Sequence, residues 1–336
     1  MSKCEIIAEI GQAHDGSLGI LLSLIDAAAD SGVDTVKFQV HIAECESSVH
    51  DEFRVKFSPA DDTRKDYWKR MELTEEQWAV VKARCEEKGC GFLATPFSVE
   101  AIEMLERIGC PRYKVGSGDV TNELFLRRLA ETKKPIILSS GLSTLQEVES
   151  AVRIIEMYGC TDYMVLQCTS EYPVPPSRWG LKQMLVLKEK LSCKVGLSDH
   201  SGTAYAGLAA VSIGASAVEV HITFSKKMFG PDALASLELR ELKMLVEGAA
   251  AISEAFTSDF DKEQFAESNQ RMRIIFGRSL VARRELMAGS VLTIEDLEAV
   301  KPSGFGLPPT QLDELVGKEM ACDVEKGGFI TEECLV

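Results

Sequence analysis

The chain has 336 residues, of which 45% are hydrophobic, so it can form a barrel of about 250 residues together with a small second domain. Its formal net charge of −15 argues against nucleic acid or an anionic membrane surface as a partner. The apolar runs are also too short, and too often interrupted by charges, to cross a bilayer.

Short apolar strands and helices alternate along the first three quarters of the chain. We predict strands over residues 5–10, 35–39, 91–94, 113–115, 135–138, 163–167, 195–197 and 217–220. We predict helices over residues 18–31, 74–88, 99–108, 145–157, 181–191, 203–213 and 239–255. Thr74 and Gln77 fit a capping box, and residues 40–71 are predicted to form one long loop. Eight strands that alternate with helices predict a closed parallel (β/α)8 barrel, the TIM barrel, rather than an open sheet.

The composition changes after residue 256. Residues 257–277 are rich in polar and charged side chains and predict a linker. Residues 278–336 have the pattern of short strands and turns, with candidate strands at 279–282, 287–292, 294–297, 312–316 and 321–326. We therefore expect a barrel domain over residues 1–256 and a small domain that packs on a barrel, either its own or a partner's.

The ten cysteines contain no CxxC pair, and several fall inside apolar strand or helix patterns. The first predicted strand follows the initiating methionine almost at once, which leaves no room for a secretory signal peptide. We therefore expect reduced thiols and a cytoplasmic location.

Polar side chains with chemical function stand at or near the carboxyl end of nearly every predicted strand. Because the carboxyl ends of barrel strands meet on the face that carries the site, we expect these side chains to surround one cavity. A purely structural role at individual strand ends would explain a few of these residues but not the whole set. The residues are Glu9, Lys37, Gln39, Thr95, Lys114, Ser117, Ser139, Tyr172, Ser198, His200 and His221.

Two histidines follow neighbouring strands of the last predicted β-α-β unit. His200 and His221 are too far apart in sequence to share a helix face, but adjacent parallel strands would direct both imidazoles into the same cavity. Such a pair suits a divalent cation that keeps positions open for substrate and water. The alternative is two unrelated histidines that hydrogen-bond to the backbone.

Two lysines and four hydroxyls predict an anion site beside the histidines. Lys37 and Lys114 are the only lysines at strand ends, and the hydroxyls are those of Thr95, Ser117, Ser139 and Ser198. Together they suit a phosphate and a carboxylate, although each hydroxyl alone could be a helix cap or a solvated loop residue. Glu9, Gln39, Tyr172 and Asp232 could bind a neutral polyol on the other side.

Nine short motifs follow one another in an order and spacing that resemble the sialic acid synthases, the family of the N-acetylneuraminate, legionaminate and pseudaminate synthases. They are AEIGQAHDGS at 8–17, VKFQ at 36–39, TPF at 95–97, YKVGSG at 113–118, LSSG at 138–141, CTSEYP at 168–173, GLSDH at 196–200, VEVH at 218–221 and GPD at 230–232. The C-terminal part is similar to the family's antifreeze-like SAF domain, which docks over the partner's barrel in a domain-swapped homodimer.

The resemblance implies a transferase that condenses phosphoenolpyruvate with an N-acyl hexosamine, releasing phosphate by C–O cleavage and giving a nine-carbon α-keto acid. It implies that His200 and His221 bind Mn2+ or Mg2+ and that Glu9 is a candidate general acid or base. Lys301 stands where the family often has an arginine that reaches the sugar's N-acyl group, which makes it a candidate substrate-binding residue. It further implies that the lysines and hydroxyls bind phosphoenolpyruvate and that the sugar contacts Glu9, Gln39, Tyr172 and Asp232.

Two other classes of protein fit part of this pattern. Another metal-dependent TIM-barrel enzyme, such as an aldolase-type lyase, would explain the two histidines, but it explains the paired lysines and the C-terminal domain less well. A non-catalytic carbohydrate-binding protein would explain the C-terminal domain but not the polar strand ends. The sugar itself remains open among N-acetylmannosamine, its 6-phosphate and a 2,4-diacetamido sugar.

Overall fold

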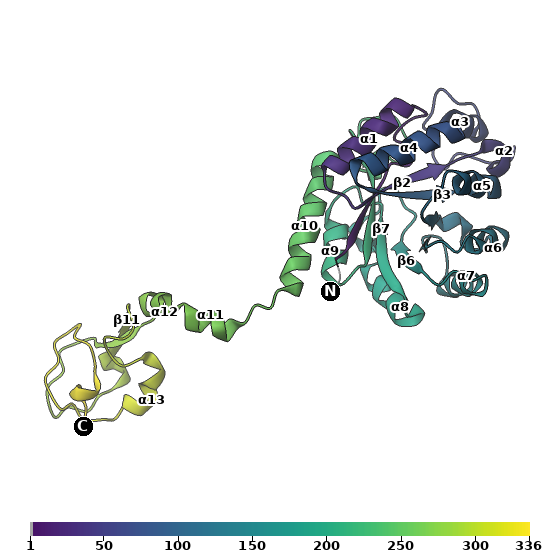
Figure 1. Cartoon of the computed structure of the whole chain (residues 1–336). Helices are drawn as coiled ribbons and strands as arrows, with labels where there is room; N and C mark the ends of the chain where they lie inside the picture. Colours follow the sequence, from purple (N-terminus) through teal and green to yellow (C-terminus); the bar gives the residue numbers. More distant parts are fainter. Residues whose placement is uncertain (1–2) are drawn as a thin grey trace. The chain divides into compact units, whose positions relative to one another are not determined.

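The computed structural model describes residues 3–336 and divides the chain into two compact units, Met1–Thr257 and Ser258–Val336. The first unit is a closed barrel of eight parallel strands whose order in the sheet follows the sequence, with β1 hydrogen-bonded to β8. Figure 1 shows the strands of this unit with helices beside them. This confirms the predicted TIM barrel. The strands are β1 (Glu5–Glu9), β2 (Thr35–Val40), β3 (Gly91–Pro96), β4 (Tyr113–Val115), β5 (Ile136–Ser139), β6 (Tyr163–Cys168), β7 (Lys194–Asp199) and β8 (Ala217–Thr223).

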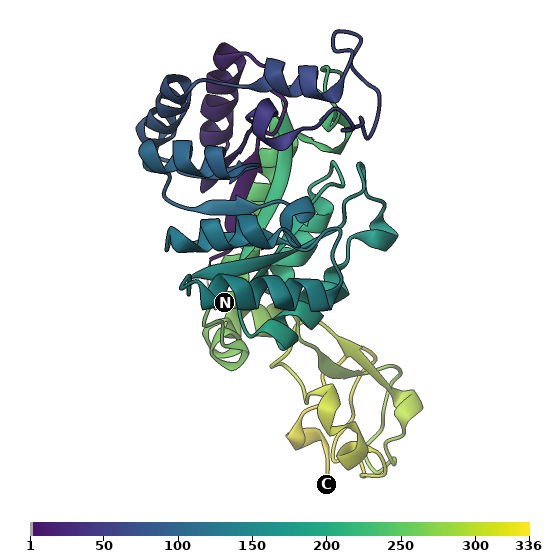
Figure 2. The ribbon, with the colours of Figure 1, turned by 90° about the vertical axis from the view of Figure 1, so that its right-hand side faces the viewer.

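Helices surround the strands (Figure 2). Thr74 caps α4 in the predicted capping box, and a short strand, β9 (Leu237–Glu238), adds to the end of β8. The helices of this unit are α1 (Leu18–Asp30), α2 (Ala43–Glu46), α3 (Arg64–Met71), α4 (Glu75–Lys88), α5 (Val99–Arg107), α6 (Glu123–Glu131), α7 (Leu145–Met157), α8 (Leu181–Leu191), α9 (Tyr205–Ser212) and α10 (Leu239–Thr257).

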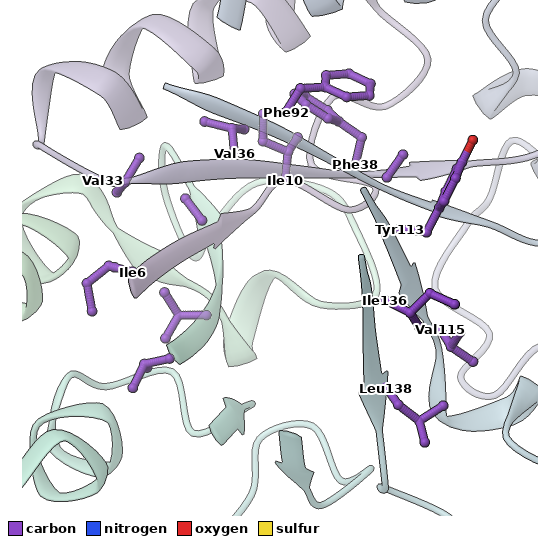
Figure 3. Close-up of a cluster of buried hydrophobic side chains, with 14 of the residues drawn as sticks. Ile6, Ile10, Val33, Val36, Phe38, Phe92, Tyr113, Val115, Ile136 and Leu138 are labelled. Carbon is purple, nitrogen blue, oxygen red and sulfur yellow. The ribbon is translucent and has the colours of Figure 1, made fainter. Parts of the chain in front are cut away.

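Alternate residues of each strand face opposite sides of the barrel wall, as the two-residue period of a strand requires. On the outer side, Phe38 of β2 stacks on Phe92 of β3 with ring centroids 5.0 Å apart, within the large core between strands and helices (Figure 3). A separate apolar cluster fills the barrel interior and forms a floor on which the polar strand ends rest. It consists of Ile7, Leu93, Ile137, Leu166 and Ala217, with Met164 packed against it.

Three helices of the first unit were not predicted. Helices α2 and α3 lie within the predicted loop 40–71, and α6 lies in the segment between β4 and β5. Both α3 and α6 are rich in charge, but each buries one face, which in α6 consists of Phe125, Leu126, Leu129 and Ala130. That spacing is typical of an amphipathic helix, so the signal was present in the sequence.

The second unit contains one antiparallel pair of strands, β10 (Ser279–Ala282) and β11 (Leu297–Val300), around a small core. Two helices, α11 (Lys262–Ser268) and α12 (Gln270–Phe276), occupy most of the predicted linker. The predicted strand at 312–316 is wrong, because this segment forms the short helix α13 (Leu312–Leu315). Segments 287–292 and 321–326 form isolated β-bridges and turns in place of full strands.

The ten cysteines, all within the described residues, are free thiols, and six of them are deeply buried in the barrel unit. Burial raises the pKa of Cys4 and of Cys110 to about 12, because a thiolate would be poorly solvated there. Cys4 and Cys110 therefore act as small apolar core residues. Within residues 3–336, no helix combines the length and the apolar character that a membrane crossing requires.

Candidate active site

One cavity of about 800 Å³ opens at the carboxyl ends of the barrel strands. Two of the sequence-predicted residues do not line it, since Glu9 is buried beneath its wall and Lys301 belongs to the second unit. The other eleven predicted residues do line it, and they come from seven strands or the loops that follow them. They are Lys37, Gln39, Thr95, Lys114, Ser117, Ser139, Tyr172, Ser198, His200, His221 and Asp232.

The two histidines lie side by side because β7 and β8 are hydrogen-bonded neighbours. The ring centroids of His200 and His221 are 5.3 Å apart, and Tyr172 stacks on His200 at 4.0 Å. Nδ1 of His200 lies 3.0 Å from the carbonyl oxygen of Thr169, to which an Nδ1–H group donates. This hydrogen bond leaves Nε2 of His200 as the nitrogen that can bind a cation.

The pKa values of the two imidazoles are shifted in opposite directions. Burial lowers the pKa of His221, which favours the neutral ring that a metal needs. Burial also opposes protonation of His200, but its contacts with Cys168 and the Thr169 carbonyl outweigh burial and raise its pKa. A cation bound to Nε2 of His200 would displace a proton from that nitrogen.

The residues present fit a divalent cation that takes only part of its coordination from the protein. No cluster of three or more candidate ligands occurs among residues 3–336, so the two imidazoles would leave most positions to substrate and water. A methyl group added at Gly11 would lie 3.3 Å from both Oε1 of Glu9 and Nδ1 of His221, which places this carboxylate next to the imidazole. Oε1 of Glu9 is buried and has no hydrogen-bond partner in the described part of the chain.

A layer of buried charges lies directly above the apolar floor. Nζ of Lys37 and Nζ of Lys114 lie 3.2 Å and 3.1 Å from the same oxygen, Oε1 of Glu219, and Lys37 also pairs with Glu9. The hydroxyl of Ser198 donates to that oxygen at 3.1 Å. Burial disfavours an ionised Glu219, but the two lysines outweigh burial and hold its pKa well below the ordinary value.

Glu219 was absent from the predicted site, although it stands within the motif VEVH. Its signal was an acidic residue in the middle of an otherwise apolar strand, two positions before His221 and therefore on the same face of β8. A charged residue on the interior face of a barrel strand requires partners, and the two lysines provide them.

Two hydroxyls in the cavity wall have no hydrogen-bond partner among the residues that the structure describes. Oγ1 of Thr95 and Oγ of Ser139 are buried and make no hydrogen bond within residues 3–336. Since a buried hydroxyl without a partner costs free energy, these groups fit a ligand that supplies acceptor oxygens.

The segment after β2 contributes cavity residues that were not predicted. The guanidinium of Arg54 lies 4.0 Å above the ring of Tyr172 and donates to Asp232 at 2.7 Å. The ring of His41 is stacked between Trp68 and Phe97, and its Nδ1 lies 2.7 Å from Glu46. The length of the predicted loop was the available signal, because long loops in compact domains are commonly functional.

A closed parallel barrel with ionic and hydroxyl side chains gathered in one cavity at the carboxyl ends of its strands defines a TIM-barrel enzyme. The model of the NeuB family matches residues 24–260, and the model of the SAF domain matches residues 277–336. The chain belongs to the NeuB family and is an enzyme of the sialic acid synthase type.

Relatives match nearly the whole chain. The N,N'-diacetyllegionaminic acid synthase of Campylobacter jejuni is 35% identical, over 99% of this chain and 100% of that one. The human N-acetylneuraminate-9-phosphate synthase is 31% identical, over 98% of this chain and 92% of that one. The solved structure of N-acetylneuraminic acid (sialic acid) synthetase from Leptospira borgpetersenii is 29% identical and superposes with a TM-score of 0.70, over 81% of this chain and 92% of that chain.

Proposed function

We propose that this enzyme condenses phosphoenolpyruvate with the open-chain form of an N-acyl hexosamine, giving a nine-carbon α-keto acid and phosphate. The observation that carries the proposal is the pairing of Lys37 and Lys114 on Glu219 in a cavity that also holds two neighbouring imidazoles. The names of the relatives, synthases of legionaminic and neuraminic acids, support the same reaction class.

The lysine side of the cavity would bind phosphoenolpyruvate. Its cations can offset the charge of the carboxylate and of the departing phosphate, and the unpartnered hydroxyls of Thr95 and Ser139 can donate to acceptor oxygens. The proposed set is Lys37, Thr95, Lys114, Ser117, Ser139 and Ser198.

His200 and His221 would hold Mn2+ or Mg2+. When bound, the cation would polarise the aldehyde oxygen as a Lewis acid. The charge of the cavity supports a cation. Within residues 3–336, five carboxylates and four lysines and arginines line it, and the proposed substrate brings further negative charge.

The sugar would lie on the opposite side, against Gln39, Tyr172 and Asp232. Glu9 is the proposed general acid or base, because its buried Oε1 lacks a partner within residues 3–336 and lies next to His221. Glu9 also forms an ion pair with Lys37.

The proposed reaction forms one carbon–carbon bond and breaks one carbon–oxygen bond. C3 of phosphoenolpyruvate bonds to the aldehyde carbon, whose oxygen takes up a proton. The oxygen of a water molecule adds to C2 and loses its protons as the bond from C2 to the ester oxygen breaks, which leaves the ketone and releases phosphate. Holding the two reacting carbons together in one cavity supplies much of the rate enhancement.

The proposal extends to the C-terminal unit, in which the SAF domain would dock on the partner's barrel in a domain-swapped homodimer. Exposed apolar side chains support an interface, since Phe256, Phe260 and Phe276 are 54%, 67% and 60% exposed. Lys301 lies with its Nζ 5.1 Å from the ring of Phe276, and its contact with the sugar's N-acyl group is part of the proposal. The cytoplasmic location also stays a prediction.

The purified full chain, phosphoenolpyruvate, Mn2+ and a panel of N-acyl hexosamines test the reaction. Phosphate release that requires both the sugar and phosphoenolpyruvate is the expected result. An aldolase-type lyase or a carbohydrate-binding protein would release no phosphate from this mixture, so the absence of release with every sugar of the panel would overturn the proposal. Omission of the sugar controls for simple hydrolysis of phosphoenolpyruvate.

A further inference from the structure

Every lysine and arginine that lines the cavity within residues 3–336 has a carboxylate partner. Lys37 and Lys114 pair with Glu219 at 3.2 Å and 3.1 Å inside the barrel. At the mouth, Arg54 pairs with Asp232 at 2.7 Å, and Arg64 pairs with Asp51 at 3.1 Å. A further anionic group on a ligand would therefore have to compete with a carboxylate for each of these cations.

The carboxylates of the mouth outnumber its cations. In addition to Asp51 and Asp232, the side chains of Glu46 and Asp119 line the cavity. Glu46 accepts from His41, and Asp119 accepts from the amide of Asn122 at 3.1 Å, so neither has a lysine or arginine partner in the described part of the chain. The mouth is therefore the negative end of the cavity, whereas the buried lysines lie at the other end.

Arg54 already has two partners, the carboxylate of Asp232 and the ring of Tyr172. Its guanidinium lies 4.0 Å above the ring of Tyr172, and that ring stacks on His200 at 4.0 Å. Withdrawal of Arg54 would break the contact with Tyr172 and leave Asp232 without its cation. Because Asp232 already offsets its positive charge, the guanidinium would attract a phosphate less than an unpaired arginine would, while it can still donate to a neutral carbonyl or hydroxyl oxygen.

We infer that the acceptor is an uncharged hexosamine and that the enzyme discriminates against a sugar carrying a phosphate ester. This inference rests on the proposed function and names its substrate class. A phosphate at the mouth would meet carboxylates that have no lysine or arginine partner within residues 3–336, whereas each lysine and arginine that lines the cavity already has a carboxylate partner. Like charges brought together in this way disfavour binding. One relative is named for a phosphorylated product, N-acetylneuraminate 9-phosphate, and another for a product without phosphate, N,N'-diacetyllegionaminic acid. Family membership therefore does not decide whether the acceptor sugar carries a phosphate.

The test compares matched sugars with the purified full-length enzyme, Mn2+ and phosphoenolpyruvate. Consumption of phosphoenolpyruvate is followed with N-acetylmannosamine, with its 6-phosphate and with uncharged 2,4-diacetamido-trideoxy hexoses. At least one uncharged sugar is expected to exceed the 6-phosphate in kcat/KM by about 100-fold. Equal or better use of the 6-phosphate would overturn the inference and leave the proposed function intact. If no sugar of either kind consumes phosphoenolpyruvate, the proposed function fails and the inference fails with it.

Variants at the mouth test whether its charges cause the discrimination. Asp51→Asn frees Arg64 from its carboxylate. Asp119→Asn removes a carboxylate that accepts a hydrogen bond from the amide of Asn122, so the second variant serves if the first does not fold. Each is expected to raise kcat/KM for the 6-phosphate relative to the uncharged sugar by about 10-fold. Glu44→Gln is the matched control. Glu44 of α2 pairs with Lys65 and Lys69 of α3, and these three residues lie outside the cavity. An unchanged ratio in both cavity variants would overturn the inference.

Discussion

Nζ of Lys114 lies 3.1 Å from Oε1 of Glu219, and both side chains are buried inside the barrel. Burial lowers the pKa of Lys114, and the carboxylate of Glu219 opposes that effect. The same oxygen accepts from Lys37 and Ser198, so one carboxylate holds three of the groups proposed to bind phosphoenolpyruvate. The charge state of the cavity therefore depends on Glu219.

Glu219→Gln is expected to lower both stability and activity. The substitution leaves two buried ammonium groups with one remaining carboxylate, Glu9, and removal of one partner from a buried ion pair costs about 3–5 kcal/mol. Denaturant titration measures this loss, and kcat/KM for phosphoenolpyruvate should fall by about 100-fold. Glu44→Gln, which removes an exposed carboxylate, is the control and should leave both quantities nearly unchanged. Wild-type stability in Glu219→Gln would show that the buried pair is not required.

Gly196→Ala is expected to destabilise the barrel without a direct effect on charge. A methyl group at this position would lie 2.2 Å from the carbonyl oxygen of Ala217 and 2.7 Å from Cδ2 of Leu166, at the apolar floor. Overpacking of this kind costs about 1–3 kcal/mol. Thermal unfolding measures it, with Gly19→Ala in helix α1 as the control, since the nearest atom to a methyl group there is 3.8 Å away. Equal melting temperatures for the two variants would contradict the close packing of β7 against β8.

The sequence predicts the barrel and most of its cavity because both depend on a local pattern. Each strand is a short apolar run that ends in a polar residue, and closure of the sheet brings those ends together without further information. The adjacency of His200 and His221 follows from one β-α-β unit, and the structure brings the two rings within 5.3 Å.

Residues outside that pattern could not be predicted in the same way. Arg54 reaches the cavity because residues after β2 fold back over the mouth, and its contacts with Tyr172 and Asp232 join segments that are more than one hundred residues apart in sequence. Glu219 and α6 are different, because their signals were present. A charged residue on an interior strand face and an amphipathic spacing are both local features.

The stability of the enzyme is expected to fall as the pH falls from 6.5 towards 4. Burial, together with His41 and Arg70, lowers the pKa of His14 from 6.5 to about 4. Between these values the unfolded chain binds a proton that the folded chain does not, so acid favours unfolding by up to about 3 kcal/mol from this residue. Denaturant midpoints at pH 7, 5.5 and 4.5 measure the slope.

His14→Gln tests whether that residue causes the slope. The amide can still accept from the backbone N–H of Gly16, to which Nδ1 of His14 is bonded at 3.1 Å, but it does not titrate. The variant should therefore lose less stability than the wild type on acidification, while His50→Gln, at an exposed histidine, should keep the wild-type slope. If His14→Gln and the wild type lose the same stability between pH 7 and 4.5, His14 is not responsible.

Divalent cations are expected to stabilise the folded chain through His200 and His221, in a measurement that needs no substrate. A ligand that binds only the folded state adds about 2.7 kcal/mol when its concentration is 100 times its Kd, so Mn2+ should raise the melting temperature and a chelator should reverse the rise. His221→Ala should abolish the rise, whereas His50→Ala should retain it, because His50 is exposed and does not line the cavity. A full Mn2+ shift in both His200→Ala and His221→Ala would mean that the cation binds elsewhere, and the imidazole pair would then need another role.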